Sequence, residues 1–510
     1  MSKNNTAHSK SKMKSTLTTL SAGALVLAAL EHAQAQYVAP PPPTPFQGFI
    51  NEFFRAKDPY MNQWDFGGNT RFRYENRQGY GIPGIAGSVD FRAHGAKVDN
   101  DYYLTRTRLH VGYTDKWWSA YVEGQSSTAN NDARYAYANA PVVPGTVKRK
   151  GNGPEADVID LHQGYVTLGN HKEFPLSAKV GRQELSYGEE RLIGAFNWNN
   201  IGRSFDAAKV RWQNEWFGAD FFSGRPVVPQ DGQFDLSNDY DFLSGMYATS
   251  LKVPKNILDV YFLARNATRH ANSAEPSPQF PQPTARDIYT VGGRMKSKPG
   301  EFDGWDYSAE GAYQFGNFAG SNTGTAAQTE RRTQNAFMFV AQGGYTFTDL
   351  WATPRLGLEY DYGSGDGNAG DGTHGTFENL FPTNHKFYGS QDFVSLQNIQ
   401  NAGINLTCKP TARMSCALMG NALWLANTDD YFYTAAGTPR TTGGYGIHPN
   451  YNSFLGSEIT AIVGYAVTRF AQVEAGYGHF FTGKYIEQSL AGVGGATDAN
   501  FVYVQTSINF

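Results

Sequence analysis

The chain has 510 residues and a formal net charge of −3, with 56 Gly, 30 Tyr and 14% aromatic residues. This mild acidity argues against nucleic acid as a partner. The mean hydropathy of −0.48 beside so many aromatic residues favours strands with one apolar and one wet face, and no apolar run reaches the roughly 20 residues of a membrane-spanning helix.

The N-terminus has the pattern of a secretory signal. Lysines at 10, 12 and 14 precede an apolar stretch at 17–30 and a small-residue cleavage site, Ala-Gln-Ala, at 33–35. We therefore expect residues 1–35 to be removed on export. Residues 36–64 follow as a periplasmic extension that contains the run APPPPTP, which is stiff and cannot join a sheet.

From residue 65 onward, apolar and polar residues alternate with a period of two. Phe72 and Tyr74 share one face of the first run, while Arg71 and Arg73 share the other. Such alternation predicts strands with one apolar face. Similar runs, about 18 in all, are predicted near 65–75, 102–113, 117–125, 157–168, 177–184, 205–212, 216–224, 241–252, 256–265, 287–296, 305–315, 335–345, 351–362, 398–408, 414–426, 458–466, 470–481 and 499–510.

The connections between these runs alternate in length. Short turns such as TDK, QN and VTR are followed by long polar segments such as 126–156 and 363–397. Short periplasmic turns and long extracellular loops are typical of a bacterial outer-membrane β-barrel. The sequence therefore predicts an all-β transmembrane barrel of about 18 antiparallel strands over 65–510, with outer-membrane lipid around it. The last run, FVYVQTSINF, ends on an aromatic residue and resembles the C-terminal strand of outer-membrane proteins.

The segment 180–206, VGRQELSYGEERLIGAFNWNNIGRSFD, is rich in arginine, glycine and aromatic residues. One interpretation is a loop that presents guanidinium groups to an anion. The other is that its arginines pair with Glu184, Glu189, Glu190 and Asp206 only to hold the loop. Arg182 has the same parity as the outward Val180, so a bulge or the strand end must turn it away from lipid. If it stays on the strand, it belongs to the scaffold.

A barrel of this size encloses an aqueous channel, and rings of Arg and Lys select anions in pores. Arginines concentrate at the inward positions of the first two strands and in the segment 180–206. We predict that nine of them contact an anion in the pore: Arg71, Arg73, Arg106, Arg108, Arg182, Arg191, Arg203, Arg211 and Arg294.

The segment GRQELSYGEERLIGAFNWNNIGRSFD resembles the alginate-export family of outer-membrane barrels, in which a GRQ…YG…R…G…W.N.GR.FD pattern recurs. The resemblance implies a monomeric barrel that exports an anionic polysaccharide such as alginate through an arginine-lined pore, and it leaves room for periplasmic secretion partners. That exporter has a long periplasmic gating loop, whereas all periplasmic turns predicted here are short. Two alternatives remain open: an uptake porin for small anionic or aromatic solutes, and a barrel enzyme.

No catalytic residues and no cofactor site can be named from spacing. Cys408 and Cys416 flank a predicted turn, which makes a disulfide across a hairpin plausible in an oxidising compartment. Asp361, Asp366 and Asp371 lie in a Gly/Asp-rich run that either binds calcium or forms a surface loop. Trp117 and Trp118 fit an aromatic girdle at the membrane interface, with sugar stacking as the alternative.

Overall fold

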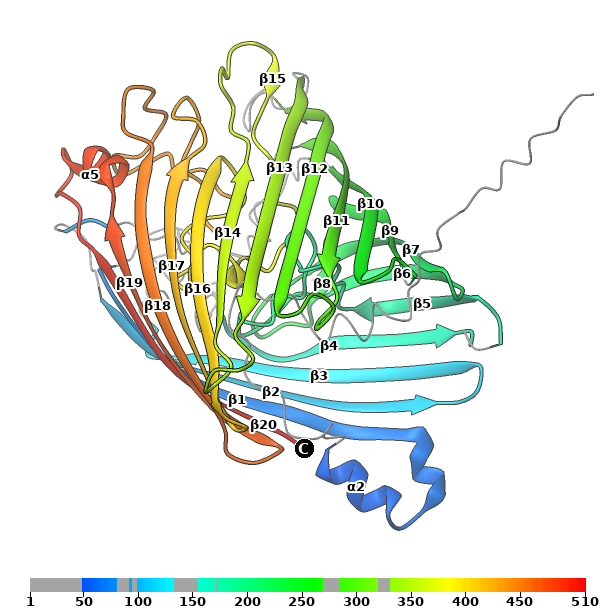
Figure 1. Cartoon of the computed structure of the whole chain (residues 1–510). Helices are drawn as coiled ribbons and strands as arrows, with labels where there is room; N and C mark the ends of the chain where they lie inside the picture. The colour runs from blue at the N-terminus through cyan, green and yellow to red at the C-terminus, as the bar shows by residue number, and fades with distance from the viewer. Residues whose placement is uncertain are drawn as a thin grey trace, which may run out of the picture.

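The computed structural model describes residues 48–79, 91–93, 99–132, 155–170, 173–250, 252–268, 285–319 and 331–510. They form a closed barrel of 18 antiparallel strands, in which β1 pairs with both β2 and β20 (Figure 1). The wall strands are β1 Trp64–Gln78, β2 Asn100–Thr114, β3 Trp118–Asn130, β4 Asp157–Leu168, β5 Leu176–Gln183, β6 Phe205–Gln213, β7 Phe217–Val228, β9 Asp241–Ser250, β10 Asn256–Ala267, β11 Arg286–Ser297, β12 Trp305–Ala319, β13 Arg331–Thr346, β14 Arg355–Gly363, β16 Ile399–Thr411, β17 Met414–Leu425, β18 Phe454–Ala466, β19 Ala471–Thr482 and β20 Ala499–Asn509.

Each of the 18 predicted runs is a wall strand, and the predicted bounds of β4 are those observed. Six short elements in the described part of the chain were not predicted: the two-residue strands β8 Leu236–Ser237 and β15 Thr373–His374, the helices α2 Phe49–Arg55 and α5 Lys484–Leu490, and the 3-10 helices η1 Pro59–Gln63 and η2 Asn384–Lys386. None of the described helices has the length and apolar character needed to cross a membrane.

Because side chains alternate along each strand, the outer surface of the barrel is apolar and the lumen is polar. On β1, Phe72 is 53% exposed and faces outward, whereas the adjacent Arg71 is 5% exposed and faces inward. Near the end of the barrel that carries the short turns, Trp64 contacts Tyr113, which in turn contacts Trp118, with ring centroids 4.9 and 5.1 Å apart. Aromatic rings gather in this way at the membrane–water interface. This arrangement supports the predicted girdle.

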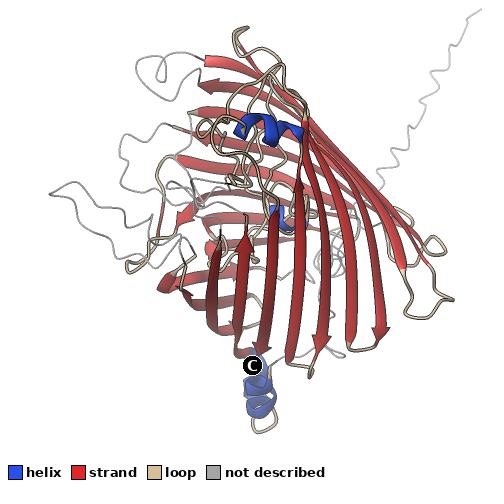
Figure 2. Cartoon of the chain, turned by 90° about the vertical axis from the view of Figure 1, so that its left-hand side faces the viewer, coloured by secondary structure: helices blue, strands red, loops and turns tan. Residues whose placement is uncertain are grey.

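Short connections all lie at one end of the barrel and long ones at the other (Figures 1 and 2). The longest connection at the short-turn end is 347–354. This end faces the periplasm by the usual orientation of outer-membrane barrels. No long loop therefore exists there among the described residues, in agreement with the sequence.

The end of the predicted N-terminal extension contains helix α2 and the 3-10 helix η1 Pro59–Gln63. Asn51 fixes α2 to β1, because it donates to Asp65 at 2.6 Å and accepts from the backbone N–H of Phe66 at 2.7 Å. Phe49 packs against the ring of Phe510, so the helix closes over the C-terminus. Figure 2 shows it beneath the barrel wall. The predicted signal and the proline-rich run lie outside the described residues.

Two long extracellular connections, 184–204 and 364–398, enter the lumen rather than staying above it. Their side chains join inward-facing wall residues in one buried apolar cluster, which includes Leu185, Ile193, Phe377, Phe381 and Phe393. An apolar cluster inside a water-filled barrel holds loops in place because it removes their side chains from water. These two loops therefore narrow the channel.

Candidate functional site

The loop 184–204, here called the constriction loop, follows β5 without a break. At Gly181 the backbone φ is +126°, a conformation that side-chain-bearing residues rarely adopt. Arg182 is 5% exposed, whereas Val180, two residues earlier, is 57% exposed on the outer face. Arg182 is therefore shielded from lipid.

Arg182 stays on the strand and binds the wall. Its guanidinium makes two hydrogen bonds to the carboxylate of Asp206, directly opposite on β6, at 2.8 and 3.1 Å. It also donates to the carbonyl oxygens of Leu161 and Asp235. With its donors occupied in this way, Arg182 serves as scaffold, and its predicted contact with a passing anion is not favoured by the geometry.

Two positions of the W.N.GR pattern in the constriction loop, Asn200 and Gly202, have a structural reason. Asn200 donates its side-chain amide to the carbonyl oxygens of Thr105, Thr128 and Glu155, each at 3.1 Å. Gly202 has a φ of +83°, and a β-carbon there would press on the guanidinium of Arg108 at 2.8 Å. Both residues therefore hold the loop closely against β2 and β3.

Arg71 and Arg106, the pair at the centre of the wall, meet the tip of this loop. They lie directly opposite each other on β1 and β2, and both donate to the carbonyl oxygen of Asn197, at 2.8 and 3.0 Å. Both also donate to the carbonyl oxygen of Asn199. Among the described residues, no carboxylate lies within ion-pair distance of either arginine, and the Nε atoms of both are buried without a partner. Two like charges in register destabilise a strand pair unless something offsets them.

Arg73 and Arg108, the other two arginines predicted to line the pore from β1 and β2, are paired with acids. Arg73 lies 2.8 Å from Glu75 on the same strand, and Arg108 lies 3.2 Å from Glu184 at the start of the constriction loop. Glu184 also contacts His162 at 2.8 Å. Burial alone would raise the pKa of Glu184, but the His162 contact and the charges of the nearby arginines lower it to about 2. Glu184 is therefore a stable counter-charge.

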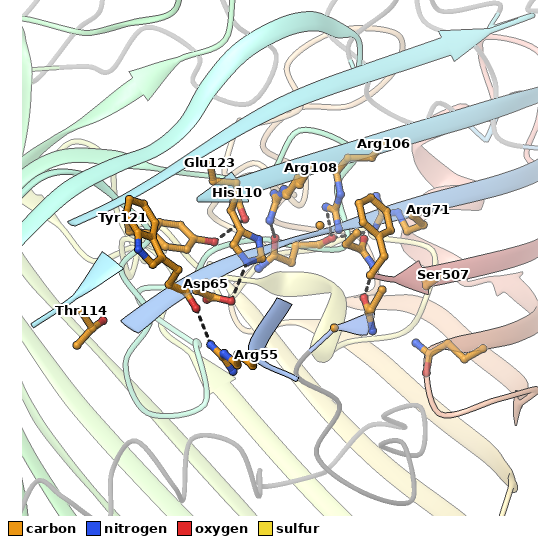
Figure 3. Close-up of a pocket in the computed structure, with 18 of the residues that line it drawn as sticks. Arg55, Asp65, Arg71, Arg106, Arg108, His110, Thr114, Tyr121, Glu123 and Ser507 are labelled. Atoms are coloured by element: carbon orange, nitrogen blue, oxygen red, sulfur yellow. Dashed lines mark hydrogen bonds and ion pairs between the residues drawn. The ribbon is translucent and has the colours of Figure 1, made fainter. Parts of the chain in front are cut away.

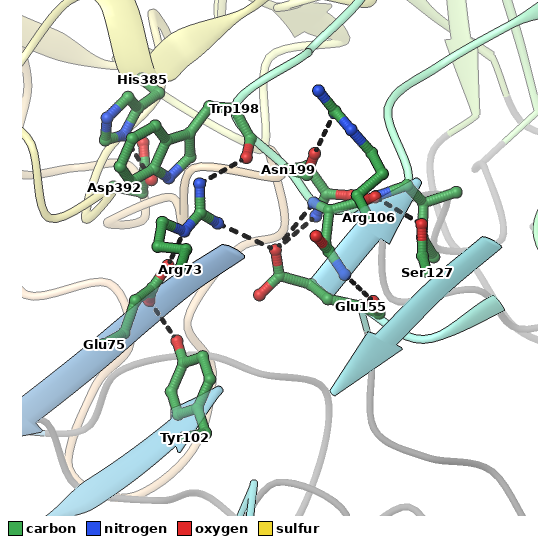
Figure 4. A network of polar contacts seen from close by, with 12 residues as sticks. Arg73, Glu75, Tyr102, Arg106, Ser127, Glu155, Trp198, Asn199, His385 and Asp392 are labelled. Atoms are coloured by element: carbon green, nitrogen blue, oxygen red, sulfur yellow. Dashed lines mark hydrogen bonds and ion pairs between the residues drawn. The ribbon is translucent and has the colours of Figure 1, made fainter. Parts of the chain in front are cut away.

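Trp198 of the constriction loop is held between two flat groups. The guanidinium of Arg73 lies 3.9 Å from the centre of the indole, and the ring of His385 stacks on it at 3.8 Å with an interplanar angle of 6°. Two groups this close to one ring centre must occupy opposite faces. Figure 4 shows this stack beside the Glu75 and Glu155 contacts. Trp198 is therefore a clamp between the wall and the second loop rather than an open platform for a sugar.

The two inward loops are joined by backbone hydrogen bonds. Ile193 and Phe381 form an isolated parallel bridge, in which the N–H of Gly194 donates to the carbonyl of Phe381 at 2.9 Å. Arg203 strengthens this junction, because its Nη1 donates to the carbonyl oxygens of Gly194, Phe381 and Pro382. The guanidinium is thus used to join the two loops.

Arg191 fixes the other side of the constriction loop. It lies 2.5 Å from Glu359 and 2.9 Å from Asp361, both on β14, and its side chain is fully buried. The sequence suggested acids within the loop itself as partners, whereas the acids come from a strand more than 160 residues later. Arg211 and Arg294 are likewise paired, with Asp220 and Asp259, each at 2.6 Å.

Two cavities adjoin Arg71, and the larger of them also adjoins Arg106. The larger, about 840 Å³, opens toward the periplasmic end and is lined by both arginines with Arg108, Asp65 and Glu123, among others (Figure 3). The smaller, about 330 Å³, lies between the two inward loops and the wall. Arg71, Asn197 and Gln505 line both cavities. Arg71 therefore borders both cavities.

The smaller cavity mixes charged, aromatic and apolar side chains. Its lining residues include Lys386, Trp198, Met419, Glu474 and Tyr503. Lys386 is paired with Glu190 at 2.8 Å, and Glu474 accepts a hydrogen bond from Tyr503 at 2.8 Å. Among the cations that line this cavity in the described part of the chain, Arg71 is therefore the one without a carboxylate within ion-pair distance.

The predicted calcium ligands are not brought together. Asp361 is bound by Arg191 and by Asn401, Asp366 lies 3.7 Å from Arg332, and Asp371 is exposed and accepts from the N–H of Thr373. Within the described residues, these three aspartates do not form a common group of ligands. This arrangement favours the second interpretation of the Gly/Asp-rich run, a loop rather than a calcium site.

Cys408 and Cys416 lie directly opposite each other on β16 and β17. Their facing positions agree with the sequence, and both are free thiols in this structure.

Sequence reasoning missed the second loop, 364–398, as part of the site. His385 and Lys386 come from this loop and line the smaller cavity. Its second half, FENLFPTNHKFYGSQDFVSL, has many large apolar side chains for an extracellular loop. That composition is the signal that predicts burial, and here the burial occurs inside the barrel.

A family model described as alginate export matches residues 63–493. The chain belongs to the alginate-export family. This match covers most of the barrel, from the start of β1 to the last extracellular connection, and it places the protein in the bacterial outer membrane. Comparison with curated protein sequences gave no match.

Solved structures of Occ and Opd outer-membrane porins have the same fold. OccAB1 of Acinetobacter baumannii matches with a TM-score of 0.54 at 11% identity, covering 88% of this chain and 97% of that one. OpdK of Pseudomonas aeruginosa, solved with vanillate, matches with a TM-score of 0.52 at 10% identity, covering 88% and 98%. OpdQ of Pseudomonas aeruginosa matches with a TM-score of 0.52 at 9% identity, covering the same shares. These alginate-export and porin likenesses identify an outer-membrane channel.

Proposed function

We propose that this member of the alginate-export family is an anion-selective channel in which Arg71 and Arg106 contact a carboxylate of the passing solute. The observation that carries the proposal is that these two arginines face each other without a carboxylate partner among the described residues. Within the described part of the chain, their hydrogen bonds go to neutral oxygens of the constriction loop. A solute carboxylate offsets this paired positive charge and accepts charge-assisted hydrogen bonds.

The dimensions of the site favour a small solute over a long polymer. Cavities of about 840 and 330 Å³ match the volume that proteins use to hold small organic molecules. The two inward loops are bonded to each other across the lumen, through Ile193 and Phe381. OpdK, which has the same fold, was solved with vanillate, a small aromatic carboxylate. We therefore place small carboxylate-bearing solutes, taken up through the channel, first among substrates.

Export of an acidic polysaccharide such as alginate is the second candidate, and the family match favours it. Both candidates use the same arginine pair, because uronates carry one carboxylate per sugar. Export of a polymer requires the two inward loops to separate, whereas uptake of a small solute does not. We further propose that the barrel works as a monomer without a catalytic step or cofactor.

Reversal-potential recording in planar bilayers under a salt gradient tests anion selectivity. We expect chloride to be preferred over potassium, and a preference for potassium would contradict the proposal. Proteoliposome swelling then separates the substrates. Small carboxylates and single uronates should enter and long polyuronate chains should not, whereas passage of the polymer would support export.

A further inference from the structure

We propose that Asp157, Asp160 and Asp235 form a calcium site that ties an extracellular loop to the barrel wall behind the constriction. Asp157 and Asp160 lie on β4, and Asp235 lies in the connection 229–240 between β7 and β9. One carboxylate oxygen of each lies within 4.8 Å of those of the other two. The three residues are 2%, 7% and 4% exposed. Oxygen ligands of this kind, held close together, are those that hard divalent cations take.

The positive charge near these three aspartates is too small to neutralise their carboxylates. Within the described residues, the sole ion-pair contact to them comes from Arg182, whose Nη1 is 4.0 Å from Asp160 while its Nε and Nη2 bind Asp206. Oδ1 of Asp157 is buried and has no hydrogen-bond partner. A buried carboxylate oxygen without a partner is costly. A bound divalent cation removes this cost.

The other two carboxylates are already oriented. Asp160 accepts from the N–H of Asp235 at 2.7 Å and from the N–H of Leu161 at 2.5 Å. Asp235 accepts from the N–H of Gln230 at 2.6 Å. These backbone contacts fix the side chains before any ion arrives, so little side-chain entropy is lost when the ion binds.

The space between the carboxylates selects the ion. All three aspartates line a cavity of about 10 Å³, together with Ser204, Gly202 and other residues. This volume holds one water-sized sphere. Mg²⁺ keeps several of its waters when it binds, whereas Ca²⁺ accepts carboxylate oxygens in irregular geometry. Calcium therefore fits better. Because Gly202 belongs to the constriction loop, the ion braces that loop from behind.

Calcium binding to the full-length barrel in detergent, after removal of metals with EGTA, tests the site. Equilibrium dialysis with radioactive calcium should give about one ion per chain at millimolar calcium, the range of extracellular calcium modules. The midpoint of heat-induced unfolding, followed by gel mobility, should rise by at least about 2 °C with calcium and less with magnesium. Asp157→Asn should lose both effects, and the matched control Asp371→Asn, at an exposed aspartate, should keep them.

The proposal is overturned if the wild-type protein binds no calcium, if Asp157→Asn binds it equally well, or if magnesium gives the same rise. Should Asp157→Asn fail to fold, Asp235→Asn replaces it. The wild-type comparison of calcium with magnesium needs no variant.

Discussion

Arg71 and Arg106 lie directly opposite each other on β1 and β2, and their guanidinium groups donate to the same carbonyl oxygen, that of Asn197, at 2.8 and 3.0 Å. The same two side chains therefore position the constriction loop and supply unpaired positive charge to the cavities beside it. Under the proposed function, selectivity and the position of the loop are coupled through this one carbonyl group.

Neutralising either arginine should weaken anion selectivity. Arg71→Gln and Arg106→Gln keep an amide that can donate to Asn197 but remove the charge. We expect each to lower the chloride-to-potassium permeability ratio by about fivefold, which corresponds to ~1 kcal/mol of charge interaction. Reversal potentials measure the ratio. Arg211→Gln is the matched control. It also removes one arginine charge, but its partner Asp220 keeps an ion pair with Lys209 at 3.2 Å. An unchanged ratio in the double variant would rule out the arginine pair as the selectivity site.

Separating the two inward loops should widen the channel. Arg203→Met removes a donor that reaches the carbonyl oxygens of Gly194, Phe381 and Pro382. Leaving these buried acceptors with fewer partners costs about 1–3 kcal/mol at the loop junction. Single-channel recording should show larger and noisier conductance than in the wild type. Arg469→Met, at an exposed arginine of a periplasmic turn, should leave conductance unchanged. Equal conductance in both variants would show that this junction does not limit flow.

Acid should loosen the second loop through His374. Burial, helped by the charge of Arg332, lowers the pKa of His374 from its ordinary value near 6.5 to about 3. Below pH 6.5 the unfolded chain protonates this histidine, whereas the folded chain keeps it neutral down to about pH 3. The free energy of unfolding is therefore unaffected by His374 above pH 6.5 and decreases as the pH falls from 6.5 toward 3. We expect the heat-unfolding midpoint to fall between pH 7 and 4. His374→Phe keeps the stack on Phe318 and should show a smaller fall. Identical pH slopes would contradict this role.

Oxidation should join Cys408 and Cys416 within one chain. The two residues face each other in register on β16 and β17, and both are free thiols. Cross-strand cysteines in register are close enough that little backbone movement is needed for bonding. After treatment with a mild oxidant, mass spectrometry of the intact protein should show a mass lower by two hydrogens, and neither thiol should react with an alkylating reagent. The Cys416→Ser variant should show no such loss of mass. Full alkylation after oxidation would show that the strand geometry forbids the bond.

The sequence by itself determines the wall of this barrel. All 18 strands follow from the alternation of residues such as Phe72 and Arg71, because a two-residue period reflects local backbone geometry and the contrast between lipid and water. The same alternation places Arg71, Arg73, Arg106 and Arg108 in the lumen. The alternating lengths of the connections predict which end carries the long loops.

Tertiary structure alone decides which arginines keep an unpaired charge. Arg191 is neutralised by Glu359 and Asp361, and Arg294 by Asp259 and Glu189, partners that no spacing in the sequence indicates. The inward fold of 364–398 and the gathering of Asp157 and Asp160 with Asp235 are equally non-local. The alternation of residues encodes the side of the wall to which a side chain points. The ion-pair partner of that side chain depends instead on how loops distant in sequence meet inside the barrel.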